Sequence, residues 1–159
     1  MVAAPVVGGR IVQGGRSKAY RPLPTRTRRA ALRAGIAAYR RGDFFEAHEL
    51  LEPAWMGTRD LAEREALQGL IKLAAAYVHA VRGNPRGVAK NLEGAEDRVR
   101  RALADGPGAG IGVDLAGLAD GIAERRAAIA VASSWPAEAA ETAAELLATA
   151  PPPELAPVP

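Results

Sequence analysis

Apolar residues recur every three or four positions from about residue 28 to residue 131, and this is the period of an amphipathic α-helix. The clearest stripe follows Asn84, where the apolar positions are spaced four, three, four and three residues apart. It consists of Val88, Leu92, Ala95, Val99 and Ala102. The pattern therefore predicts an all-α protein.

Two short turns interrupt this pattern, the RGD triplet at residues 41–43 and the RGN triplet at residues 82–84, 41 residues apart. In each triplet the glycine can take the left-handed conformation that ends a helix, and the following Asp or Asn can cap the next helix. Each turn therefore joins two consecutive helices. We expect a compact bundle of five to six helices built from two consecutive αα-hairpins.

The second helix is expected to begin at the N-cap Asp43, with Glu46 completing a capping box. Pro53 removes a backbone hydrogen bond, so we expect a kink or an early end near Glu52. The buried side of this helix is expected to hold Phe44, Phe45, Leu51 and Trp55.

The third helix, about residues 61–82, is predicted to be the central one. Between Glu65 and Arg82 its only charge is Lys72, so residues 66–81 should be buried on most sides. We expect it to pack against both the second and the fourth helix. Its buried face is expected to hold Leu70, Leu73, Tyr77 and Val81. A fifth helix is expected after Asp114, and a short sixth one at about 136–150.

The chain is expected to divide into a flexible basic leader at 1–27, a helical domain at 28–131, and a short helix with a Pro-rich, mobile tail at 132–159. Residues 1–42 carry ten Arg or Lys and no acidic residue, whereas residues 43–159 carry 11 basic against 18 acidic residues, a net charge of 11 − 18 = −7. Such a basic arm can bind a polyanion weakly and without specificity, or fold back on its own acidic domain.

Composition excludes some classes of function. The chain has no cysteine, which excludes disulfides, thiolate metal sites and a thiol nucleophile. No segment approaches the run of about 20 apolar residues that spans a bilayer, and the N-terminus lacks the pattern of a secretory signal. We therefore expect a cytoplasmic protein with no membrane partner.

The candidate site is a polar cluster between the second and third helices. His48 and Glu52 are neighbours at i and i+4, and Glu49 is next to Glu52 at i and i+3. Gln68 and His79 share one stripe of the central helix. Because buried polar groups need partners, we expect His48, Glu49, Glu52, Gln68 and His79 to converge.

Two interpretations of this cluster stay open. One is a hydrogen-bonded network that holds the helices in register. The other is a Zn, Mn or Fe site with His48, Glu52 and His79 as ligands. The zinc-protease spacing His-Glu-x-x-His is absent, and so is the di-iron spacing Glu-x-x-His. No cofactor is predicted, and a divalent metal is the alternative.

Three blocks follow one another along the chain: RGDFFEAHELLE at 41–52 followed by Trp55, LQGLI at 67–71 leading to His79, and RGN at 82–84 followed by Gly87. In this order they resemble a bacterial and archaeal family called domain of unknown function 309. Lys72 and Pro53 depart from the family's pattern. The resemblance implies a compact all-α fold and no established activity. It also marks Glu46, His48, Glu49, Glu52, Trp55, Gln68, His79, Gly83 and Asn84 as motif positions.

These observations favour a non-catalytic structural or interaction module. One alternative is an enzyme that binds a metal or small ligand through the His/Glu cluster. Another is a nucleic-acid-associated protein that acts through residues 1–42. Self-association is compatible with all three.

Overall fold

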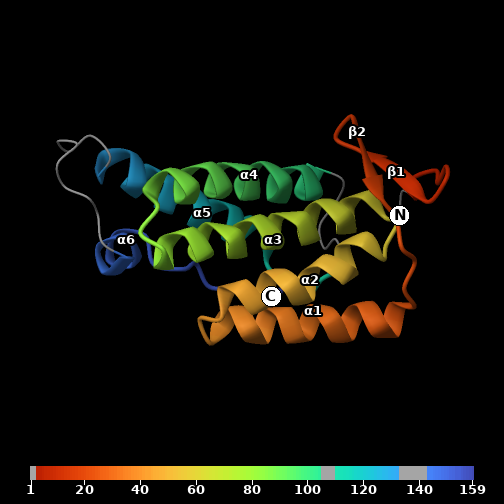
Figure 1. Cartoon of the computed structure of the whole chain (residues 1–159), viewed down its shortest axis with the longest axis horizontal. Coiled ribbons are helices and arrows are strands. Elements are labelled where there is room, and N and C mark those ends of the chain that lie inside the picture. Colours follow the sequence, from red (N-terminus) through yellow and green to blue (C-terminus); the bar gives the residue numbers. More distant parts are fainter. Residues whose placement is uncertain (1–2, 105–109, 133–142) are drawn as a thin grey trace.

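The computed structural model describes residues 3–104, 110–132 and 143–159. Six helices and one small two-stranded sheet follow one another along the described chain (Figure 1). They are β1 (Arg10–Gln13), β2 (Arg16–Ala19), α1 (Thr25–Arg40), α2 (Phe44–Met56), α3 (Leu61–Val81), α4 (Pro85–Ala104), α5 (Leu115–Ala132) and α6 (Ala143–Thr149). The predicted compact all-α bundle is confirmed. None of these helices is both long and apolar enough to cross a membrane.

Helix α3 lies in the middle of the bundle, as predicted. It packs against α2 on one side and α4 on the other, and α4 packs in turn against α5 (Figure 1). The pairs α1–α2 and α3–α4 are the two expected αα-hairpins. The β-hairpin lies at the end of the bundle where α3 begins, and α6 lies at the opposite end (Figure 1).

The predicted turns and caps are confirmed. The Asp43 carboxylate accepts a hydrogen bond from the amide of Glu46 at 3.3 Å, and Asp60 accepts one from Glu63 at 3.1 Å. The side chains of Asn84 and Asp114 cap α4 and α5 in the same way. Gly42 and Gly83 have φ values of 83° and 67°, the left-handed conformation that ends a helix.

The core confirms most, but not all, of the predicted buried positions. Leu70, Leu73 and Tyr77 are at most 1% exposed, whereas Val81 is 50% exposed because it is the last residue of α3. Phe45 was also wrongly placed in the core and is 59% exposed. Phe44 fills the space between Tyr39 and Tyr77, whose ring centroids lie 5.4 and 5.3 Å from its own. Successive residues of a helix point about 100° apart, so Phe45 points away from this space.

The early end of α2 predicted near Glu52 is wrong, because the helix continues through Pro53 to Met56, and the alternative, a kink, stays a prediction. Proline removes only one hydrogen bond of the helix, and other donors hold the last turn. The amide of Gly57 bonds the carbonyl of Pro53 at 2.9 Å, and the amide of Arg21 bonds that of Met56 at 2.9 Å.

The expected flexible leader is wrong for residues 10–19, which form the antiparallel β-hairpin with Gln13 opposite Arg16. The two-residue connection Gly14-Gly15 has φ values of 57° and 73°, as tight hairpin turns require. Ile11 and Gln13 are each 1% exposed, so alternate residues of β1 are buried against the bundle. The boundaries expected after residues 27 and 131 stay a prediction.

The expected mobile tail is also wrong. Leu155 is 2% exposed, and the backbone after α6 is hydrogen-bonded to α1, α3 and α5. Of the predicted sixth helix, residues 143–149 are helical, and residues 136–142 lie outside the described part of the chain.

Candidate functional site

The structure brings only part of the predicted polar cluster together. His48, Glu49 and Glu52 offer ligand atoms that all lie within 4.8 Å of one another on α2. The Nδ1 atom of His48 is 3.3 Å from Oε1 of Glu49, and the two side chains are 32% and 55% exposed. Gln68 and His79 have other partners, so the expected five-residue cluster does not form.

Gln68 belongs instead to a buried network that sequence reasoning missed. Its Oε1 atom accepts a hydrogen bond from Nε2 of Gln13 at 2.8 Å. The Oε1 atom of Gln13 accepts from the indole of Trp55 at 3.0 Å and from Nε of Arg64 at 3.1 Å. The network therefore joins β1, α2 and α3. Its sequence signal was faint, because Gln13 stands in a four-residue strand far from its partners.

Arg64 is fully buried and completes this network with backbone acceptors. Its guanidinium donates to the carbonyls of Thr58 at 2.9 Å, Trp55 at 3.1 Å and Ala19 at 3.3 Å. It also lies over the indole ring of Trp55, 5.2 Å from the centroid. Burial lowers the pKa of Arg64, but an arginine stays charged at neutral pH. The network holds the hairpin against the bundle.

His79 pairs within the turn between α3 and α4. Its Nδ1 atom is 3.1 Å from the side-chain nitrogen of Asn84. A Cβ atom added at Gly87 would lie 2.5 Å from the imidazole, so the glycine leaves room for the ring against α4. His79 therefore supports the turn and is not a ligand of the cluster on α2.

A second group of side chains, the cationic surface, was also missed. We define it as Arg16, Lys18, Lys72, Lys90, Arg98 and Arg101, which come from β2, α3 and α4. The tip of the hairpin approaches α4 closely, because a Cβ atom added at Gly14 would lie 3.1 Å from Arg98 and 3.2 Å from Arg101. This contact brings the basic strand β2 to the basic side of α4.

Lys72 extends across α4 to reach this surface. A Cβ atom added at Gly94 would lie 2.9 Å from Cδ and 3.4 Å from Nζ of Lys72, so the side chain passes over the glycine. Lys90 and Arg98 lie one helical turn before and after Gly94. Burial lowers the pKa of Lys72, and the positive charges of Arg98, Lys18, Lys90 and Arg16 lower it further.

Only part of the cationic surface is neutralised within the chain. Arg98 makes two 3.0 Å bonds to the carboxylate of Glu65, and Arg101 lies 3.2 Å from Asp97. Within the described residues the other four cations have no carboxylate partner. They are Arg16, Lys18, Lys72 and Lys90.

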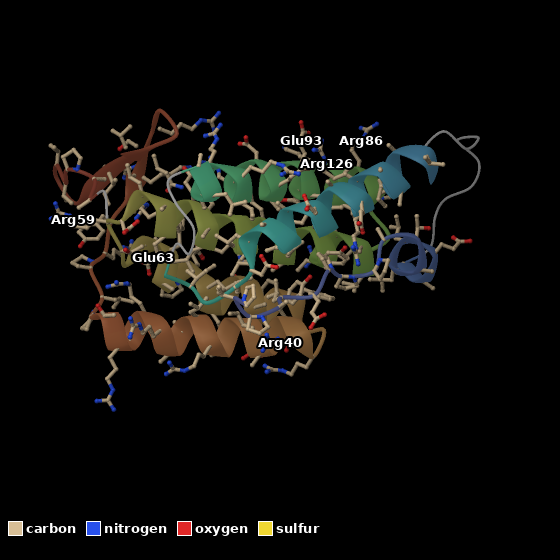
Figure 2. All side chains as sticks on the ribbon, turned by 180° about the vertical axis from the view of Figure 1, so that it is seen from behind. Arg40, Arg59, Glu63, Arg86, Glu93 and Arg126 are labelled. Atoms are coloured by element: carbon tan, nitrogen blue, oxygen red, sulfur yellow. The ribbon has the colours of Figure 1, made fainter. Side chains whose placement is uncertain are left out.

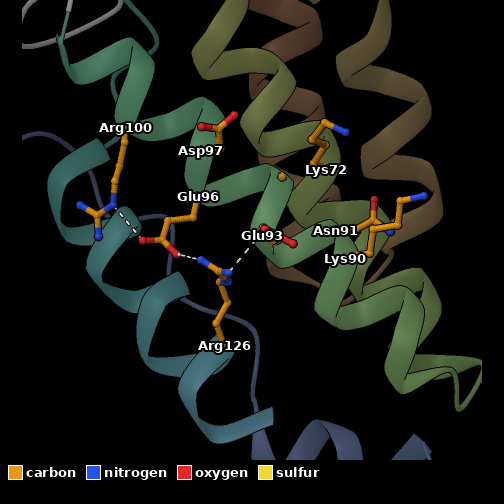
Figure 3. Close-up of a pocket in the computed structure, with 9 residues that line it drawn as sticks. Lys72, Lys90, Asn91, Glu93, Glu96, Asp97, Arg100 and Arg126 are labelled. Atoms are coloured by element: carbon orange, nitrogen blue, oxygen red, sulfur yellow. Dashed lines mark hydrogen bonds and ion pairs between the residues drawn. The ribbon is translucent and has the colours of Figure 1, made fainter. Parts of the chain in front are cut away.

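An open pocket of about 570 Å³ adjoins this surface. Figure 3 shows Lys72 and Lys90 on one side of α4 and Arg100 and Arg126 on the other. The acidic residues of its lining already have arginine partners: Glu96 bonds both Arg100 and Arg126, at 2.8 and 2.7 Å. The lysines are therefore the groups of this lining that remain available to an added anion.

The arginines expected to form a basic arm on α1 do not act as one group. Arg28 lies 3.7 Å from Glu63, Arg41 lies 3.6 Å from Glu46, and Arg40 bonds a carbonyl of the tail. Arg29 and Arg33 are exposed and have no ion pair among the described residues. Arg26 is likewise exposed without an ion pair among the described residues, so α1 also carries unpaired charge, but from one element, whereas the cationic surface draws its cations from three.

Comparison with known proteins finds a family model that matches a stretch within α1 to α4. Residues 32–91 match the family model described as "Domain of unknown function (DUF309)". The match confirms, over these residues, the resemblance predicted from the sequence motifs. No curated protein and no solved structure matches the chain. The DUF309 segment contains Lys72, Lys90 and the cluster on α2, whereas the hairpin, Arg98 and Arg101 lie outside it. The cationic surface thus combines DUF309 residues with residues outside the DUF309 segment.

Proposed function

We propose that this protein is an interaction module that binds the phosphate backbone of nucleic acid on the cationic surface. The observation that carries the proposal is that Arg16, Lys18, Lys72 and Lys90 gather from three elements with no carboxylate partner among the described residues. Like charges repel, and a phosphate would relieve this repulsion. A cytoplasmic location, where nucleic acid is available, is part of the proposal.

The shape of the surface supports a polymer as ligand. Lys90 and Arg98 are eight residues apart on α4, or roughly 12 Å along its axis. The basic strand β2 continues the surface beyond Arg98, where the hairpin tip meets α4. Such an array can contact several successive phosphates. It contains no aromatic residue for stacking on bases, so binding should be independent of sequence.

The buried polar groups support an interaction role over a catalytic one. Gln13, Gln68 and Arg64 bond one another and backbone carbonyls, and this arrangement serves to hold the hairpin in place. Since the hairpin carries Arg16 and Lys18, the network positions part of the binding surface.

The experiment compares two double variants that remove the same charge. Binding of a fluorescent 20-base-pair duplex is followed by anisotropy at low salt. Lys72→Gln with Lys90→Gln should weaken binding about tenfold, because two phosphate contacts are lost. Arg29→Gln with Arg33→Gln removes two exposed charges from α1 and should weaken it less than twofold. Equal losses in the two variants would refute the proposed surface.

A second candidate function is the binding of a divalent cation at His48, Glu49 and Glu52. The observation that favours this function is that each of the three side chains offers a ligand atom and that these atoms lie within 4.8 Å of one another. One imidazole and two carboxylates suit Zn, Mn or Fe. All three ligands come from a single exposed side of α2, so the remaining coordination positions would face solvent or a partner.

A further inference from the structure

The C-terminal segment lies on the bundle as an extended peptide. After α6 the chain has the sequence APPPELAPVP at 150–159 and forms no helix or named strand. It runs past α1 and α2 on the side of the molecule seen in Figure 2, where Arg40 lies beside it. Leu155 is 2% exposed, so the segment is packed against the bundle and not merely tethered.

The bundle contacts this segment with hydrogen-bond donors. The hydroxyl of Tyr77 bonds the carbonyls of Ala150 at 3.0 Å and Pro151 at 3.1 Å. The hydroxyl of Tyr39 bonds the carbonyl of Pro153 at 2.8 Å. The guanidinium of Arg40 bonds the carbonyl of Leu155 at 2.6 Å, and that of Arg125 bonds the carbonyl of Pro151 at 2.9 Å.

This set of donors matches the chemistry of a proline-rich peptide. Proline has no backbone N–H, so the run at 151–153 offers carbonyl acceptors alone. Burial raises the pKa of Tyr39 and of Tyr77, which keeps both hydroxyls protonated and able to donate. Four side chains from α1, α3 and α5 therefore recognise backbone atoms that any peptide of this shape would present.

Apolar contacts at two points add selectivity. Leu146 is 1% exposed on α6, and Leu155 is buried beyond the proline run. Past Leu155 the tail pairs with the segment before α5: the amide of Asp114 bonds the carbonyl of Ala156 at 2.8 Å. A ligand would thus need an extended backbone, prolines in the middle and a leucine two residues after the last proline of the run.

We propose that this surface, the tail groove, is a peptide-binding site and that residues 143–159 are its exchangeable ligand. In one copy the tail binds its own groove, and the tail of a second copy can take its place. Recognition through backbone carbonyls and two leucines does not depend on which chain supplies the tail, although the chain's own tail has the advantage of a high effective concentration. This inference is independent of the cationic surface.

The test cuts the chain between α5 and the tail while the tail is still bound in its groove. A site-specific protease sequence is placed within residues 133–142 of the full chain, and the folded protein is cut there. A fluorescent synthetic peptide of residues 143–159 is then added in excess. We expect one labelled peptide to enter each groove and to displace the original fragment. The uncut chain should bind the peptide at least tenfold more weakly, because the linked tail has a high effective concentration.

Two controls make the result specific. A peptide carrying Leu155→Asp should bind at least tenfold more weakly than the unchanged peptide. Tyr39→Phe in the cut protein should weaken binding severalfold, and Arg33→Gln, also on α1 but without a contact to the tail, should not. The proposal fails if the fragment does not exchange under excess peptide, or if the cut chain unfolds when the fragment leaves.

Discussion

Arg64 on the central helix and Gln13 on β1 are joined by a 3.1 Å hydrogen bond from Nε to Oε1, although they stand 51 residues apart in the chain. Other donors of Arg64 go to carbonyls of the last turn of α2, of the connection after it and of β2. Among the described residues, no carboxylate accepts a hydrogen bond from this buried guanidinium. The position of the hairpin therefore depends on one side chain that bonds several other segments at once.

Arg64→Lys should lower the free energy of unfolding by about 1.5–3 kcal/mol, because one ammonium cannot reach all the acceptors that the planar guanidinium serves. Urea denaturation measures the loss. Arg59→Lys, at an exposed arginine in the same connection (Figure 2), is the control and should change stability by less than about 0.5 kcal/mol. Similar values for the two variants would mean that Arg64 has no special role.

The packing of α3 makes a prediction about core truncation. Leu70→Ala or Leu73→Ala should each cost about 2–5 kcal/mol, since each leaves a cavity in the most buried helix. Val81→Ala at the half-exposed end of the same helix should cost less than about 1 kcal/mol. Denaturant titrations of the three variants provide the comparison. Losses below about 0.5 kcal/mol at both leucines would be incompatible with a central α3.

Glu96 should make stability depend on acid pH. Burial tends to raise the pKa of Glu96, but hydrogen bonds from Arg126 and Arg100 outweigh it and hold the pKa below its usual value. The folded state thus binds this proton less readily than the unfolded chain, whose glutamate has a pKa of about 4.3. The resulting stabilisation is present above that pH and is lost as the pH falls through the lower folded pKa.

Glu96→Gln should therefore cost about 1 kcal/mol at pH 7, and the difference from the unchanged protein should shrink below about pH 4. Melting curves across this range measure it. Glu93→Gln is the matched control, because Glu93 is 70% exposed and reaches Arg126 only at 4.0 Å. A cost for Glu96→Gln that stays the same at pH 3 and pH 7 would contradict the assigned ion pairs.

Cation binding at the α2 cluster predicts that Zn²⁺ or Mn²⁺ raises the melting temperature, and that above Kd the rise follows the logarithm of the metal concentration. When the free metal concentration is about one hundred times Kd, binding adds about 2.7 kcal/mol to the free energy of unfolding. His48→Ala should remove the rise, whereas His79→Ala should keep it, because His79 bonds Asn84 and lies outside the cluster. A melting temperature that does not respond to either metal would eliminate this candidate function.

Local signals in the sequence were enough to predict the bundle. Asp43 and Asn84 cap helices where expected, since a cap depends on residues only three positions apart. The hairpin was missed because four-residue strands show little alternation, although the Gly14-Gly15 pair was a hairpin signal. The tail was missed because its proline-rich composition is that of mobile segments.

The site was less predictable because it depends on contacts between distant elements. Gln68 was expected to join the polar cluster of His48 and Glu52, but its partner Gln13 comes from a strand that had not been foreseen. Lys72 was noticed as the only charge between Glu65 and Arg82 and as a departure from the family's pattern. Its interaction with the charges of Lys90 and Lys18 follows from how α4 and the hairpin pack on α3, which periodicity along one helix cannot reveal.

The salt dependence of nucleic-acid binding tests the central claim most directly. Affinity for the duplex is measured at several salt concentrations, and log Kobs is plotted against log salt. Four to six phosphate contacts predict a slope of about −4 to −5, and Lys72→Gln with Lys90→Gln should make it shallower by about 2. Arg29→Gln with Arg33→Gln should leave the slope unchanged. A slope near zero for the unchanged protein, or one that the two lysines do not alter, would contradict phosphate binding at the cationic surface.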